Sequence, residues 1–148
     1  MGVSFNTNFE QEYVAISQVY EVNKMQDFRK LKVYQEAYGL AKDIYNELKD
    51  VKGSFRVKEQ LFGASTAICA NLAEMGSFDN RNQQKQKLTT CIGEANETEF
   101  WLNFCKDVNL LSEERFKEFL NRTKATRMML YNLHKSIKEA IENVQPTN

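Results

Sequence analysis

Residues that break helices are scarce in this chain of 148 residues, which has one proline, Pro146, and six glycines. Since proline is the strongest helix breaker and none occurs before residue 146, the sequence favours a helical protein. Charge of one sign is also lacking, because 20 lysines and arginines balance 20 aspartates and glutamates. With 42% hydrophobic residues, the chain differs from disordered sequences, which combine low hydrophobicity with high net charge. We expect one globular all-α domain.

Cysteine is also infrequent, and long hydrophobic runs are absent. The three cysteines, Cys69, Cys91 and Cys105, cannot all pair within one chain and lie among apolar residues. They are expected to be buried free thiols in a reducing cytoplasm, so we predict a cytoplasmic protein. No apolar run reaches 18 residues, and the N-terminus lacks a basic segment followed by an apolar one. We therefore expect no membrane span and no secretory signal.

The usual motifs of enzymes and cofactor sites are missing too. His134 is the only histidine, and no nucleophile motif accompanies it, so it is interpreted as a plain surface or groove residue on the last helix. A di-iron bundle needs a Glu-x-x-His pair on each of two helices, which one histidine cannot supply. Neither a Cys-x-x-Cys pair nor a glycine-rich phosphate-binding motif is present. We expect no metal, no cofactor, no small-molecule substrate and no enzymatic activity.

Apolar residues spaced three and four apart predict two helices in the first half of the chain. One covers about residues 30–50 and is broken by Gly53. The next begins after Ser54, which is expected to cap it, and ends at Gly76, which is expected to provide a left-handed stop. The predicted apolar stripe of the first helix contains Tyr34, Tyr38, Ala41, Tyr45 and Leu48.

Two longer helices are predicted in the second half. Asn80, with Gln83 three residues later, resembles a capping box for a helix that reaches about residue 108. That helix is apolar around so much of its circumference that it should contact more than one neighbour. The last helix opens at Ser112 and continues for roughly thirty residues, or about 45 Å. Short connections force consecutive helices to pack antiparallel, so we predict an antiparallel up-down-up-down four-helix bundle over residues 27–144.

The two ends of the chain are predicted to lie outside this bundle, as an N-terminal appendage (residues 1–26) and a tail (residues 145–148). Through Asp27, the N-terminal segment has one lysine against four carboxylates, a net charge of −3. One side of a short helix there would carry Phe9, Tyr13, Ile16 and Tyr20. The same segment would serve equally well as a strand. We expect it to pack on the bundle or on a partner.

Two groups of polar residues could belong to a site. Glu94 and Glu97 lie one turn apart on the third predicted helix, near Glu99, with Glu74 at the end of the second. They could bind a cation or act as acid and base, but a solvated or intersubunit face is preferred because no second ligand type accompanies them. Asn71 interrupts an apolar seam, where a lone asparagine fixes helix register through a hydrogen-bond partner. We prefer that structural role to ligand binding.

Basic residues are the remaining candidate for binding. From residue 115 to residue 138, seven lysines and arginines face one glutamate, a local charge of +6. Such stripes can bind phosphate, although basic helix faces are usually only solvated and this chain is neutral overall. The candidate nucleic-acid contacts are Arg122, Lys124 and Arg127 in this stripe and Arg81, Lys85 and Lys87 at the start of the third helix.

Three segments resemble one known family. The first helix follows its pattern F-x-x-L-x-V-[W/Y]-x-x-A from Phe28 to Ala37. The second resembles its S-I-P-x-N-I-A-E-G signature, with Asn71 and Glu74 in place, and the third has the Gly and Glu of A-x-G-S-L-x-E at Gly93 and Glu97. Over about residues 27–141 the chain resembles the four-helix-bundle proteins encoded in intervening sequences of bacterial 23S rRNA genes.

That resemblance implies a homo-oligomer, expected to be a pentamer, without enzymatic activity. It extends in fold to the accessory variability determinant of diversity-generating retroelements, a basic pentamer that binds a reverse transcriptase and its RNA. We therefore predict a homo-oligomeric scaffold associated with RNA or with a reverse transcriptase, in which Trp101 and Phe104 contact a neighbouring subunit. Asn71 and Glu74 are expected to hold the second helix against the third. The alternative is a protein–protein adaptor oligomer with no nucleic-acid role.

Overall fold

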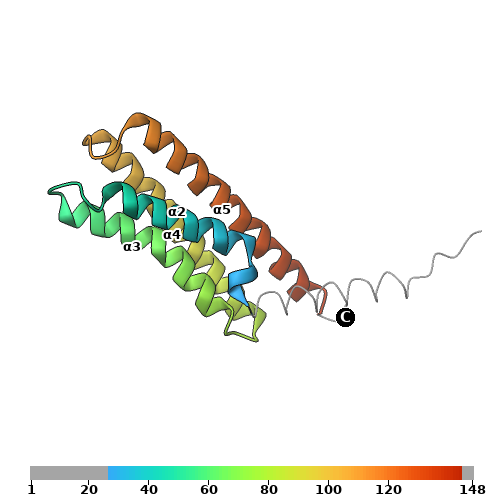
Figure 1. The fold of residues 1–148 in the computed structure, drawn as a ribbon. Helices are drawn as coiled ribbons and strands as arrows, with labels where there is room; N and C mark the ends of the chain where they lie inside the picture. The colour runs from blue at the N-terminus through green and yellow to red at the C-terminus, as the bar shows by residue number, and fades with distance from the viewer. Residues whose placement is uncertain (1–26, 145–148) are drawn as a thin grey trace, which may run out of the picture.

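The computed structural model describes residues 27–144, which form four long helices in a row of consecutive hairpins (Figure 1). The elements are η1 (Phe28–Lys30), a single 3-10 turn, then α2 (Lys32–Leu48), α3 (Phe55–Met75), α4 (Arg81–Asp107) and α5 (Glu113–Glu142). No strand occurs within residues 27–144, so the all-α prediction is confirmed. The predicted N-terminal appendage and C-terminal tail lie outside the described residues.

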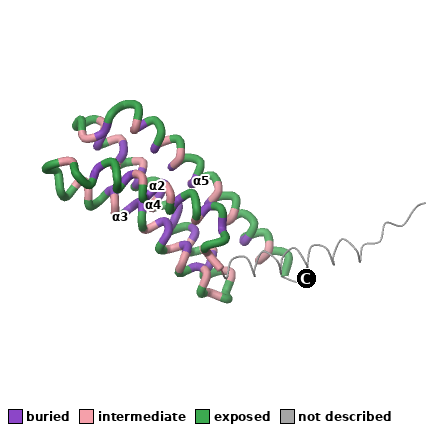
Figure 2. The backbone as a smooth tube through the Cα atoms, viewed as in Figure 1, coloured by how far each residue is buried: buried purple, intermediate pink, exposed green. Residues whose placement is uncertain are grey.

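The core shows how the helices run. It consists of two clusters, one at each end of the bundle, and each cluster combines the first half of one helix with the second half of the next. The first cluster includes Val33, Leu72, Leu88 and Leu130. The second includes Leu48, Leu61, Leu102 and Phe119. Neighbouring helices are therefore antiparallel, and Figure 2 shows their buried sides turned towards one another.

Two of the predicted helix starts are confirmed in atomic detail. The Asn80 side chain accepts hydrogen bonds from the backbone N–H groups of Asn82 (2.9 Å) and Gln83 (3.2 Å) at the start of α4. The Ser112 hydroxyl accepts one from the backbone N–H of Arg115 (3.2 Å) at the start of α5. Both caps satisfy backbone donors that the first turn of a helix leaves unpaired.

Two other predictions about helix ends are wrong. Ser54 precedes α3 but has a left-handed backbone (φ 51°) and makes no side-chain capping bond, because a capping side chain needs an extended backbone at that position. Gly76 has ordinary right-handed angles (φ −62°), and the chain leaves α3 through the next turn. A left-handed residue does follow α4, where Asn109 has φ 61°. Asparagine tolerates this conformation better than most residues.

The three cysteines are free and buried, as predicted. Burial raises the pKa of the Cys69 thiol to about 11 and is the main cause that raises the pKa of Cys91 to about 12. None of the helices in residues 27–144 is long and apolar enough to cross a membrane.

Candidate functional site

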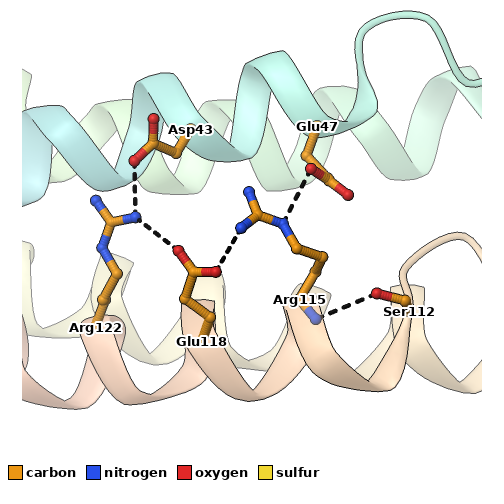
Figure 3. Close-up of polar contacts among 6 residues, drawn as sticks. All are labelled: Asp43, Glu47, Ser112, Arg115, Glu118 and Arg122. Carbon is orange, nitrogen blue, oxygen red and sulfur yellow. Dashed lines mark hydrogen bonds and ion pairs between the residues drawn. The ribbon is translucent and has the colours of Figure 1, made fainter.

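The predicted basic stripe lies on α5, but two of its arginines are tied to α2. Nη1 of Arg122 lies 2.8 Å from Oδ2 of Asp43 on α2 and 3.6 Å from Oε1 of Glu118 on its own helix. Two turns earlier, Nε of Arg115 lies 3.1 Å from Oε2 of Glu47, and its guanidinium also pairs with Glu118. Figure 3 shows the two arginines reaching across the seam towards α2, with Glu118 between them. These contacts neutralise much of the charge that the sequence assigns to α5.

The other two candidate phosphate contacts on α5 differ from each other. Arg127 pairs with Glu99 on α4, and its Nη1 lies 2.9 Å from Oδ1 of Asn96. Lys124, in contrast, is exposed and makes no ion pair within residues 27–144. Of the three predicted phosphate contacts on α5, only Lys124 is therefore unpaired among the described residues.

The basic residues at the start of α4 do not form one patch. Lys87 faces α3, where it pairs with Glu74 and lies 3.4 Å from Oδ1 of Asn71. Lys85 lies on the other side of α4, towards α5, and contributes to a lowered pKa of His134, although burial of the imidazole is the larger cause. The Nη1 atom of Arg81 is buried and has no hydrogen-bond partner in the described part of the chain.

Asn71 and Glu74 of α3 both lie beside Lys87 of α4. The Asn71 amide donates to the backbone oxygen of Ala67 one turn earlier (2.8 Å), and its oxygen faces Lys87. Asn71 is only half-buried, because the core position next to it belongs to Leu72. The pair thus lies at the edge of the α3–α4 seam.

The carboxylates that suggested an enzyme separate in the structure. Glu74 and Glu99 each pair with a different base, Lys87 and Arg127. Glu94 remains near Glu97, and its pKa is raised by partial burial first and by the Glu97 charge second. Among the described residues, no group of three or more histidine, cysteine, aspartate or glutamate side chains could hold a metal ion. One close pair of glutamates is all that is left of the cluster.

An aromatic surface covers the outer side of α4 near its C-terminal end. It is formed by Glu97, Phe100, Trp101, Phe104 and Val108, which we call the α4 surface. The Trp101 ring is 4.8 Å from that of Phe100 and 5.9 Å from that of Phe104, between centroids. Its indole N–H donates to Oε1 of Glu97 one turn earlier (3.3 Å). Phe100 is 57% exposed, and Phe104 and Val108 are exposed as well.

Gly93 lies one turn before Glu97 on the same helix. It is exposed, and a Cβ atom built on it would meet nothing within 4 Å. Glycine in the middle of a helix costs roughly 0.5–1 kcal/mol relative to alanine. Nothing among the described residues requires a glycine at this position.

A hollow surface was not predicted from the sequence, because helical spacing places its tyrosines in the predicted apolar stripe of the first helix. Tyr38 and Tyr45 are about half exposed, and the buried side of α2 is formed instead by smaller aliphatic residues. The tyrosines form one wall of a groove of about 520 Å³ between α2 and α3, the α2–α3 groove. It is lined by Phe28, Tyr34, Tyr38, Ala41, Lys42, Tyr45, Asn46, Thr66, Cys69, Ala70 and Ala73. The sequence does contain an indication of this groove, because three tyrosines lie along one side of the first helix and the second helix contains several small residues.

Comparison with known proteins gives the family. The sequence model of the 23S rRNA-intervening sequence proteins matches residues 29–132. A solved structure of a protein with unknown function from the S23 ribosomal protein family of Bacteroides thetaiotaomicron is similar, with a TM-score of 0.67 and 25% identity over 70% of this chain and 95% of that one. No curated protein matches the sequence significantly. Because the family model spans well over half of the chain and the fold agrees, this chain belongs to the 23S rRNA-intervening sequence protein family.

Proposed function

We propose that this protein is a non-enzymatic, cytoplasmic, homo-oligomeric scaffold, a pentamer of four-helix bundles, which presents its surface to a protein partner. The observation that carries this proposal is the α4 surface, where the exposed rings of Phe100 and Phe104 both contact the half-buried Trp101. Contiguous exposed apolar side chains mark interaction sites, and aromatic residues are enriched at the centres of protein interfaces. Copies of this chain are proposed to pack against each other there.

Gly93 supports this assignment. Its position in the middle of α4 lowers helix stability without any gain in packing among the described residues. Because Gly93 has no Cβ atom, a helix of a neighbouring copy could approach α4 closely at this position. Glu94 and Glu97, on the same side of α4, would then pair with basic residues of that copy.

A protein is preferred to RNA as the partner because of the paired arginines. Arg122 and Arg127 have carboxylate partners within the bundle, so contact with phosphate would require breaking those pairs. RNA, or a reverse transcriptase with its RNA, is the second candidate. It is supported by Lys124, which is free of ion pairs within the described range, and by the way a ring would repeat that lysine around its axis.

Native mass measured by light scattering during size exclusion tests the oligomer. Wild-type protein should have five times the 17.2 kDa mass of one chain. Phe104→Asp should lower that mass to one chain while the helical circular dichroism stays unchanged, because Phe104 lies outside the core. Tyr131→Asp, at an exposed aromatic residue of α5, is the control and should leave the mass unchanged. A wild-type monomer, or a pentamer that survives Phe104→Asp, would refute the assignment.

Titration with a structured RNA at two salt concentrations separates the partners. A phosphate-binding protein loses affinity steeply between about 50 and 200 mM salt, roughly as the number of phosphate contacts. The proposed scaffold for a protein partner should show no such binding at either concentration. If the protein binds RNA in a salt-dependent way and Lys124→Gln weakens that binding, the proposed protein partner is refuted. The function is then that of an RNA-associated scaffold.

A further inference from the structure

The α2–α3 groove is an apolar surface that the proposed oligomer contact on α4 does not use. Its wall is a row of aromatic side chains on α2, where the rings of Tyr34 and Tyr38 stack with centroids 5.8 Å apart. Its floor consists of small residues of α3, among them Ala70 and Ala73. The groove exists because large side chains flank small ones, so a third helix could lie between α2 and α3 with its apolar side inwards.

We infer that residues 9–20 of this same chain occupy the groove as an additional helix. This occupant is supported by the position of Phe28, near the start of the described chain. Phe28 lines one end of the groove, and its ring lies 4.9 Å from that of Tyr34. The described chain therefore begins at the groove itself. Six connecting residues, 21–26, can span up to about 20 Å, which is enough for the chain to turn back along α2.

The length and spacing of the segment match the groove. On a helix, Phe9, Tyr13, Ile16 and Tyr20 share one side. Phe9 and Tyr20 are eleven positions apart in the sequence, and so are Tyr34 and Tyr45 on α2. In a helix, each spacing corresponds to about 16 Å. With Tyr20 placed near Tyr34, the segment runs antiparallel to α2.

That direction also places opposite charges together. The same register sets Glu12 opposite Lys42, whose Nζ atom lies 5.0 Å from the centre of the Tyr38 ring. Lys42 is the one charged side chain that lines the groove, whereas residues 9–20 contain two glutamates and no basic residue. The register therefore brings an acidic segment against the lysine of an otherwise apolar surface.

A helix fits this site better than the strand that the sequence also allowed. A strand needs a neighbouring strand to pair its backbone groups, and residues 27–144 contain none. A helix satisfies its own backbone and needs only an apolar surface.

Hydrogen exchange of the full-length protein, followed by mass spectrometry, tests the inference. In the wild type, backbone amides of residues 9–20 should exchange at least about tenfold more slowly than an unstructured chain. Ala70→Glu, which places a carboxylate on the floor of the groove, should return them to the unstructured rate. Ala125→Glu, the same change at an exposed alanine of α5, is the matched control and should keep the protection.

Three results would overturn the inference: no protection in the wild type, equal protection in Ala70→Glu, or protection lost in the Phe104→Asp monomer. The last would assign the groove to the segment of a neighbouring copy. The inference does not depend on the α4 surface, because a monomeric wild type with protected residues 9–20 would support it while refuting the proposed oligomer.

Discussion

Replacement of Arg122 by glutamine tests whether the basic stripe of α5 stabilises the bundle or is free to bind phosphate. Arg122 joins α5 to Asp43 of α2 and pairs with Glu118 (Figure 3). Glutamine keeps much of the length of the side chain and removes its charge. If the pairs stabilise the fold, the variant should unfold at a lower urea concentration than wild type, with the same dependence on urea.

The size of the effect follows from the exposure of the three side chains. Their exposed fractions lie between 30% and 48%, so water screens both pairs. Partly exposed ion pairs contribute about 0.2–1 kcal/mol each, which gives about 1 kcal/mol for the two together. That loss should lower the melting temperature by about 4 °C in a domain of this size. In about 1 M salt, where charges are screened over about 3 Å, the difference from wild type should shrink.

Lys124→Gln is the matched control, since Lys124 is an exposed neighbour on α5 without an ion pair within the described residues. It should change the free energy of unfolding by less than about 0.5 kcal/mol. Equal unfolding free energies for Arg122→Gln and Lys124→Gln would refute the structural role of Arg122. A double-mutant cycle with Asp43→Asn isolates the pair, and a coupling energy near zero would contradict the reasoning as well.

Four further predictions concern the core, the helix ends and the thiols. Leu130→Ala should lower the free energy of unfolding in urea by about 2–5 kcal/mol, because the side chain is fully buried, and a smaller loss would contradict its place in the core. Asn80→Ala should cost about 1 kcal/mol through the lost cap. Ser54→Gly should instead stabilise by about 1 kcal/mol, because glycine adopts the left-handed backbone without strain, and a loss of stability would refute this. Cys69 and Cys91 should react with a thiol reagent at mildly alkaline pH only when the protein is denatured, because burial raises the pKa of both, and rapid labelling of the folded protein would contradict their burial.

The sequence predicted the helices well because their indications are local. Apolar spacing and the absence of proline indicated four helices, and the caps at Asn80 and Ser112 depend on residues within three positions. Backbone angles in the turns were harder to predict. Gly76 is right-handed although glycine is the usual left-handed stop, and Ser54 is left-handed although serine disfavours that region, because the path between packed helices decides the backbone there.

The candidate site was less predictable, since charge counted along a chain omits partners from other helices. Counted along the chain, the basic stripe of α5 contains one glutamate, whereas the fold adds the carboxylates of Asp43, Glu47 and Glu99. These residues lie 28 to 79 positions away in the sequence. A net charge calculated over one helix therefore overestimated the charge available to phosphate.

The sequence by itself determined the helix content and the family, because both depend on residue type and short spacing. Only the tertiary structure decided which apolar side chains remain outside. Tyr38 and Tyr45 share the periodicity of the core residues of α2, yet they border the α2–α3 groove. Helical periodicity identifies one side of a helix. How much of that side is covered depends on where the neighbouring helices lie, and here small residues of α3 leave the tyrosines open.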